Sequence, residues 1–136
     1  MAVARHSLRT ALRRNRIGIA ALTLLMLAGC AGTPEFAEVE VQVEPPGGVE
    51  LAQDAELRVW LSDAGGTLAE TRATPSGAGP WPAALRFDQR TLEAASAPRL
   101  AAELRQQGRI THITPEPSEM PASGRGPVSL PLEPRP

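Results

Sequence analysis

The chain has 136 residues and carries 14 basic residues, all of them arginine, against 15 acidic residues, for a net charge of −1. Five of the arginines lie before residue 30, so the remaining 107 residues hold nine basic and 15 acidic groups and a net charge of −6. Such an acidic chain is repelled by phosphate backbones, which argues against nucleic-acid binding.

The first 29 residues have the order of a secretory signal peptide. An arginine-rich stretch without acidic residues (1–16) is followed by twelve uncharged, mainly apolar residues (17–28). As a helix this run would span about 18 Å, which is too short for the roughly 30 Å hydrocarbon core of a bilayer. We therefore expect a transient export signal. The pair Arg13-Arg14 leaves a twin-arginine signal as an alternative, although residues 15–16 are not the apolar pair which that motif requires.

The signal ends in Leu27-Ala28-Gly29-Cys30, which holds the only cysteine of the chain. These four residues resemble the lipobox of bacterial lipoproteins. The resemblance implies that the Cys30 thiol receives a diacylglycerol group, that Cys30 becomes the first mature residue, and that lipid holds the protein on a membrane. The alternative is an ordinary signal peptide with a coincidental cysteine. Residues 30–36 would form the lipidated N-terminus and tether, and Ala31, where an aspartate commonly marks inner-membrane retention, favours the outer membrane facing the periplasm.

Alternation of apolar and polar residues predicts two strands that are each buried on one face. Residues 38–44 place three valines on one face and glutamates on the other, and residues 55–62 alternate in the same way. The glutamates of the first strand are interpreted as a solvated face, with cation binding as the alternative. In the second strand Trp60 shares the polar face with Glu56 and Arg58. That tryptophan is either covered by a loop or exposed as part of a binding patch.

A hairpin turn at residues 63–66 and a weaker strand at 67–74 come next. Trp81 lies between two prolines after a loop and is a second candidate binding residue. Residues 84–87 predict a short strand, and Asp88 is a candidate N-cap for a single helical turn.

Residues 92–107 are ambiguous between helix and strand. Their composition favours a helix, but Pro98 interrupts the stretch and the apolar residues from Leu100 onwards alternate. A hairpin would pair residues 99–105 with 109–114 around a turn at 106–108. Residues 114–127 predict a long loop, too polar to be buried. The last strand, 128–132, contains Pro131, which favours a sheet edge because proline has no N–H to donate.

The order and spacing of three stretches resemble a known family. They read QDAELRVWLSD at 53–63, LRFD at 85–88 and LAAELRQQGRI at 100–110. The chain is similar here to the YbaY-like lipoproteins and their relatives, the YscW-type pilotins of type III secretion, over about residues 36–132. The resemblance implies an all-β fold, a single small antiparallel β-sandwich of about seven or eight strands occupying residues 37–133. We therefore expect residues 99–105 to form a strand despite their helix propensity.

Few residues are available for catalysis. Cys30 is consumed by lipid and His6 is removed with the signal, which leaves His112 without a second imidazole or a thiol to form a zinc site or a Cys-His pair. The sequence contains no phosphate-binding loop and no nucleophile elbow. We expect a protein that is not an enzyme and that has no cofactor or metal site.

Three functions remain open. The first is a peptide- or protein-binding module, chaperone-like or pilotin-like, that pairs by strand addition with an envelope or secretion-system protein and docks an apolar side chain beside Trp60 or Trp81. The second is a structural envelope accessory without a discrete ligand. The third is a domain that binds a small molecule or an inhibitor. An exposed apolar groove near either tryptophan would favour the first, and a closed concave pocket would favour the third.

Overall fold

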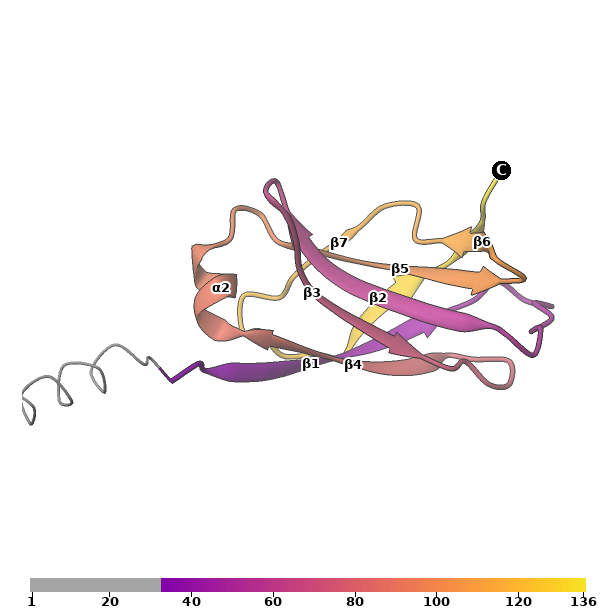
Figure 1. Ribbon diagram of the computed structural model, residues 1–136, viewed down its shortest axis with the longest axis horizontal. Helices are drawn as coiled ribbons and strands as arrows, with labels where there is room; N and C mark the ends of the chain where they lie inside the picture. Colours follow the sequence, from indigo (N-terminus) through magenta and orange to yellow (C-terminus); the bar gives the residue numbers. More distant parts are fainter. Residues whose placement is uncertain (1–32) are drawn as a thin grey trace, which may run out of the picture. The chain divides into compact units, whose positions relative to one another are not determined.

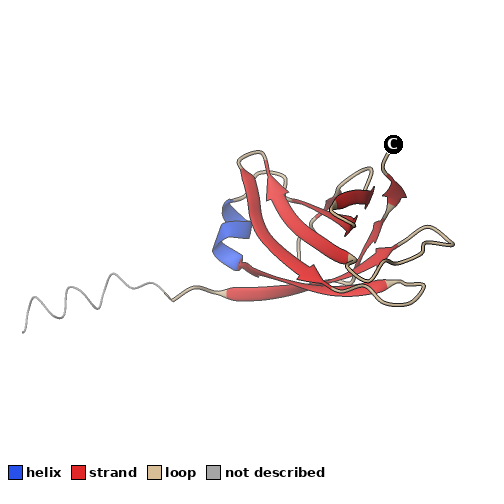
Figure 2. Cartoon of the chain, turned by 45° about the vertical axis from the view of Figure 1, so that its right-hand side comes forward, coloured by secondary structure: helices blue, strands red, loops and turns tan. Residues whose placement is uncertain are grey.

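The structure is a computed structural model that describes residues 33–136. These residues form two β-sheets (Figure 1). The predicted signal peptide and Cys30 lie outside these residues. The described residues form nine strands, two of them only two residues long, and one short helix. Figure 2 colours the strands red and the helix blue. The expected all-β sandwich is confirmed. Within residues 33–136, no helix has the length and apolar character needed to cross a bilayer.

The smaller sheet has the strand order β4-β1-β8. Strand β1 (Phe36–Glu44) lies in the centre, antiparallel to β4 (Trp81–Asp88) and parallel to β8 (Val128–Pro131). The parallel pair corrects the expectation of a wholly antiparallel sandwich, because the long connection after residue 113 returns the chain to the same end at which β1 begins. Pro131 lies on an edge strand, as its missing N–H predicts.

The larger sheet has the strand order β3-β2-β5-β6-β9, and every pair in it is antiparallel. Its strands are β3 (Gly66–Ala73), β2 (Glu56–Asp63), β5 (Arg99–Gln106), β6 (Arg109–Ile113) and β9 (Glu133–Pro134), and β7 (Ser118–Glu119) pairs with the start of β5. The β5–β6 hairpin turns at Gln107 and Gly108, whose φ angles are both positive, at 52° and 74°. Two positive φ angles are what a type I′ hairpin turn requires.

The helical expectation is confirmed for one short segment only. Helix α2 (Gln89–Ala94) follows β4, and the carboxylate of its N-cap, Asp88, accepts a hydrogen bond from the Arg90 amide at 2.9 Å. Beyond Pro98 the chain is extended, because strand β5 places Leu100 and its alternate neighbours in the core at 0% exposure. Burial between the sheets therefore outweighs the helix propensity of this stretch.

The core lies between the two sheets and takes one face from each of the longer strands β1, β2, β4 and β5, together with residues of β8. The valines of β1 and the alternate aliphatic residues of β2 and β5 are fully buried; they are Val39, Val41, Val43, Leu57, Val59, Leu61, Leu100, Ala102 and Leu104. The period-two patterns thus predicted the inward faces correctly. At one edge of the two sheets β3 lies beside β4. In both views the hairpin end of β3 stands away from β4, whereas its other end approaches it (Figures 1 and 2).

Most of the segment 114–127 is exposed, as its polar composition predicts, but three of its residues are buried. Thr114 and Met120 are only 4% and 9% exposed. The Thr114 hydroxyl accepts a hydrogen bond from the Ala102 amide at 3.0 Å, and the Met120 amide donates to the Pro98 carbonyl. A few contacts with β5 thus hold the segment against the larger sheet while most of its residues stay in solvent.

Candidate binding face on the larger sheet

Trp60 lies in the middle of β2 on the outer face of the larger sheet. Its neighbours in the core strand, Val59 and Leu61, point inward, so the alternation of the strand directs the indole outward. Directly opposite Trp60 are Glu70 on β3 and Ala101 on β5. The small alanine leaves room for the large ring to lie across the sheet, and Trp60 is half-buried.

Arg58 covers one side of the Trp60 ring. Its guanidinium carbon lies 4.6 Å from the ring centroid, a cation–π contact. The same guanidinium donates to Glu70 at 2.8 Å and to Glu103 on β5 at 3.4 Å. Of the two states expected for Trp60, covered by a loop or exposed, the structure shows an intermediate one in which a neighbouring side chain covers part of the ring.

Five charged side chains form a continuous network around this tryptophan, which we call the outer-face ion network (Glu56, Arg58, Glu70, Arg72 and Glu103). Arg72 extends it by pairing with Glu70 and with Glu56, each at 3.2 Å. With three carboxylates and two guanidinium groups the network has a net charge of −1. It connects β5, β2 and β3 across the sheet, and it fixes the charges that surround Trp60.

Mutual hydrogen bonding keeps the central pair of this network ionised. The hydrogen bond to Glu70 is the largest cause that raises the pKa of Arg58, and the hydrogen bond from Arg58 is the largest that lowers the pKa of Glu70. Glu103 differs from the other network members because it is only 5% exposed, on the part of the outer face where β5 is covered by side chains of β2. The face therefore combines a partly open aromatic ring, a fixed cation and a buried carboxylate.

Trp81, the other candidate binding residue, lies in the core. It is 2% exposed, and its indole N–H donates to the Gly77 carbonyl oxygen at 3.1 Å. As the first residue of β4 it faces the larger sheet rather than solvent. In this conformation its ring offers no exposed surface on which a partner could dock.

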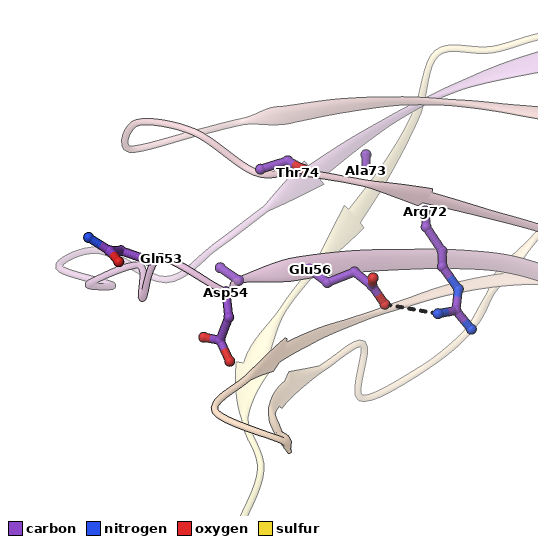
Figure 3. Close-up of a pocket in the computed structure, with 7 residues that line it drawn as sticks. Gln53, Asp54, Glu56, Arg72, Ala73 and Thr74 are labelled. Carbon is purple, nitrogen blue, oxygen red and sulfur yellow. Dashed lines mark hydrogen bonds and ion pairs between the residues drawn. The ribbon is translucent and has the colours of Figure 1, made fainter.

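An open hollow of about 430 Å³ lies at the end of β2 and β3 nearest the network (Figure 3). Its lining consists of Gln53, Asp54, Ala55, Glu56, Arg72, Ala73 and Thr74. Figure 3 shows the Glu56–Arg72 ion pair of the network at its wall. Small-molecule sites are usually enclosed and mainly apolar, whereas this hollow is open and largely polar. It does not favour the small-molecule alternative.

Residues 33–136 contain no cluster of three or more histidine, cysteine or acidic side chains that could hold a metal ion. His112 is half-buried on β6, and its Nδ1 lies 3.0 Å from the Thr111 hydroxyl. The glutamates of β1 (Glu38, Glu40 and Glu44) are exposed on the outer face of the smaller sheet, as a solvated face requires.

None of the five members of the network was identified as a site residue from the sequence. Glu70 and Arg72 lie in the weak strand β3, where alternation gives little information, and Glu103 lies in the stretch with helix propensity. For Arg58 a local signal existed, because it shares the outer face of β2 with Trp60 two residues away. The partners of Arg58 follow only from the pairing of β2 with β3 and β5.

Comparison with known proteins gives one family and one similar fold. Residues 34–130, more than two thirds of the chain, match the family described as type III secretion system lipoprotein chaperone (YscW). No curated protein matches the chain. Among solved structures, the chain is similar to an alternative pilotin from the type II secretion system of Vibrio cholerae, with a TM-score of 0.61 and 17% identity over 73% of this chain and 98% of that one. At this identity the likeness concerns the fold.

Proposed function

The chain belongs to the family of type III secretion system lipoprotein chaperones (YscW), and we propose that it is a lipid-anchored, pilotin-like chaperone that binds a secretion-system protein of the cell envelope. The observation that carries the proposal is the family match over residues 34–130, and the residues that resemble a lipobox and end at Cys30 support the proposed lipid anchor. A chaperone family supports binding rather than catalysis. The narrower kinship with YbaY-like lipoproteins stays a prediction.

The proposed anchor is lipid on Cys30, on the outer membrane and facing the periplasm. Each buried CH₂ of an acyl chain contributes about 0.8 kcal/mol to membrane binding, so two or more chains hold a protein stably on a membrane. We expect the Cys30→Ala variant to leave the membrane fraction. If it still sediments with membranes in unaltered amount, the anchor is not the lipid on Cys30.

We propose that the partner binds over Trp60 and the outer-face ion network. Tryptophan and arginine are the residue types most enriched where partners contribute most binding energy. The open side of the Trp60 ring can receive an apolar side chain. Because the network carries −1 and the chain from residue 30 carries −6, basic or neutral residues should surround that side chain in the partner.

Strand addition to β3 would bring a partner to this face. Among the described residues β3 pairs only with β2, so its other edge makes no ladder. The hairpin end of β3, which stands away from β4, is the open part of that edge (Figures 1 and 2). A strand added there would gain main-chain hydrogen bonds, and its side chains would lie next to Glu70, with Trp60 one strand further across the sheet and within reach of a long side chain only.

In-cell crosslinking followed by purification of this protein tests the proposal. We expect recovery of an envelope component of a secretion system, reduced in the Trp60→Ala and Glu70→Ala variants. Glu40→Ala removes an equally charged, exposed glutamate from the other sheet and should leave recovery unchanged. Recovery should also fall as salt rises. If no envelope protein exceeds background in any strain, the structural accessory function takes precedence.

A further inference from the structure

Phe36, the first residue of β1, is the large apolar side chain that residues 33–136 leave exposed, at 56%. It lies on the outer face of the smaller sheet, in register with Asp88 on β4. A single exposed apolar residue is common on protein surfaces and by itself needs no explanation. The position of Phe36 in the chain is what gives its exposure significance.

Phe36 lies six residues after Cys30. Six residues span at most about 22 Å even when fully extended, so a lipid on Cys30 confines Phe36 to the neighbourhood of the membrane surface. The end of this tether is fixed to the domain, because the Gln89 amide donates to the Glu35 carbonyl oxygen at 2.7 Å. The start of β1 and helix α2 accordingly lie at one end of the domain, and the β3–β4 loop lies at the other (Figure 1).

Arg86 on β4 accompanies Phe36. Its guanidinium carbon lies 4.3 Å from the centroid of the Phe36 ring. Within residues 33–136 no carboxylate forms an ion pair with Arg86, so its charge is available to an external anion. An aromatic ring beside an arginine suits the membrane–water boundary, where the ring enters the apolar side and the guanidinium reaches the phosphates.

We propose that Phe36 and Arg86 form a contact with the headgroup region of the phospholipid membrane in which Cys30 is anchored. This inference rests on the lipidation of Cys30 in the proposed function. A lipid on Cys30 by itself does not set the orientation of the domain relative to the membrane. A second point of contact sets that orientation and keeps the end that carries α2 against the membrane. Because Glu38 is paired in register with Arg86 and Asp88 with Phe36, the contact has acidic neighbours, and a zwitterionic surface suits it better than a strongly anionic one.

Tryptophan fluorescence in vesicles tests the contact. The full-length protein, processed and lipidated in cells, is reconstituted in phosphatidylcholine vesicles whose acyl chains carry bromine near the headgroup, a short-range quencher. The Phe36→Trp variant is compared with Ser76→Trp, which places the same probe at an exposed position of the β3–β4 loop. The unsubstituted protein supplies the background from Trp60 and Trp81, and mass spectrometry establishes lipidation of each sample.

We expect bromine to quench the added emission of Phe36→Trp and not that of Ser76→Trp. Adding Arg86→Gln to Phe36→Trp should reduce the quenching, because the guanidinium no longer binds phosphate. Equal quenching at the two positions, or none at position 36 in a lipidated sample, would overturn the inference and leave the proposed chaperone function intact. Samples in which Cys30 carries no lipid would instead contradict the anchor on which both depend.

Discussion

Replacing Arg58 with alanine should destabilise the domain by leaving the Glu103 carboxylate buried without its cation. The Glu103 side chain is 7% exposed and that of Arg58 is 25% exposed. Removing one partner of a fully buried ion pair costs about 3–5 kcal/mol. Because Arg58 is partly solvated and its bond to Glu103 is 3.4 Å long, we reduce the expected loss to about 2 kcal/mol. For a domain of this size that corresponds to a fall in Tm of roughly 8–16 °C.

A second substitution separates charge from packing. In the Arg58→Ala background, Glu103→Gln removes the unpaired charge while preserving the shape of the side chain, and should restore about 1 kcal/mol or more. Arg58→Met retains an unbranched stem over Trp60 and measures the packing contribution by comparison with alanine. Urea unfolding of residues 31–136 gives all four free energies. If the double variant is no more stable than Arg58→Ala alone, the buried charge is not the cause of the loss.

Two further perturbations follow from particular contacts. Alanine at position 126 would place its Cβ against the carbonyl oxygen of Glu40, so Gly126→Ala should displace β8 from β1 and lower the free energy of unfolding by about 1–3 kcal/mol. The control Gly47→Ala has open space around it and should change the free energy of unfolding by less than about 0.5 kcal/mol. Arg58 lowers the pKa of Glu70 in the folded state, so the ionised carboxylate stabilises the fold at pH values above the ordinary glutamate pKa of about 4.3. This contribution is lost as pH falls through the lowered pKa, and Glu70→Gln should therefore make the free energy of unfolding fall less steeply with decreasing pH in the acidic range.

Period-two alternation was the most informative sequence signal, since it depends only on local geometry. In β1 and β2 it identified the buried face residue by residue, and Val41 and Val59 are both fully buried. The turn at Gln107-Gly108 was equally local. The pairing of strands is not local. Neither the parallel contact of β8 with β1 nor the position of Glu103 beside Arg58 could be predicted before the order of strands in each sheet was known.

Strand β5 shows why the stretch from 92 to 107 was ambiguous. Five consecutive residues of this strand, 100–104, are buried. Its inner face meets the core, and its outer face is covered in turn, with Ala101 opposite Trp60 and Glu103 under Arg58. A central strand that is covered on both faces does not need strict alternation, so its sequence can be rich in alanine and leucine and resemble a helix. The family resemblance resolved what the local pattern could not.

On β2, alternation places the residues proposed to bind a partner and the residues that form the core on opposite faces of the sheet. Trp60 and its core neighbours Val59 and Leu61 are adjacent in sequence but point to opposite faces of the sheet. Removing the indole should therefore affect a partner far more than the core. Arg58 is different, because it contacts Trp60 and also neutralises the buried Glu103. Loss of a partner in an Arg58 variant would combine a damaged binding face with a weakened fold, and Glu70, the main partner of Arg58, shares this property. Trp60 is therefore the position at which a loss of binding can be attributed to the face itself.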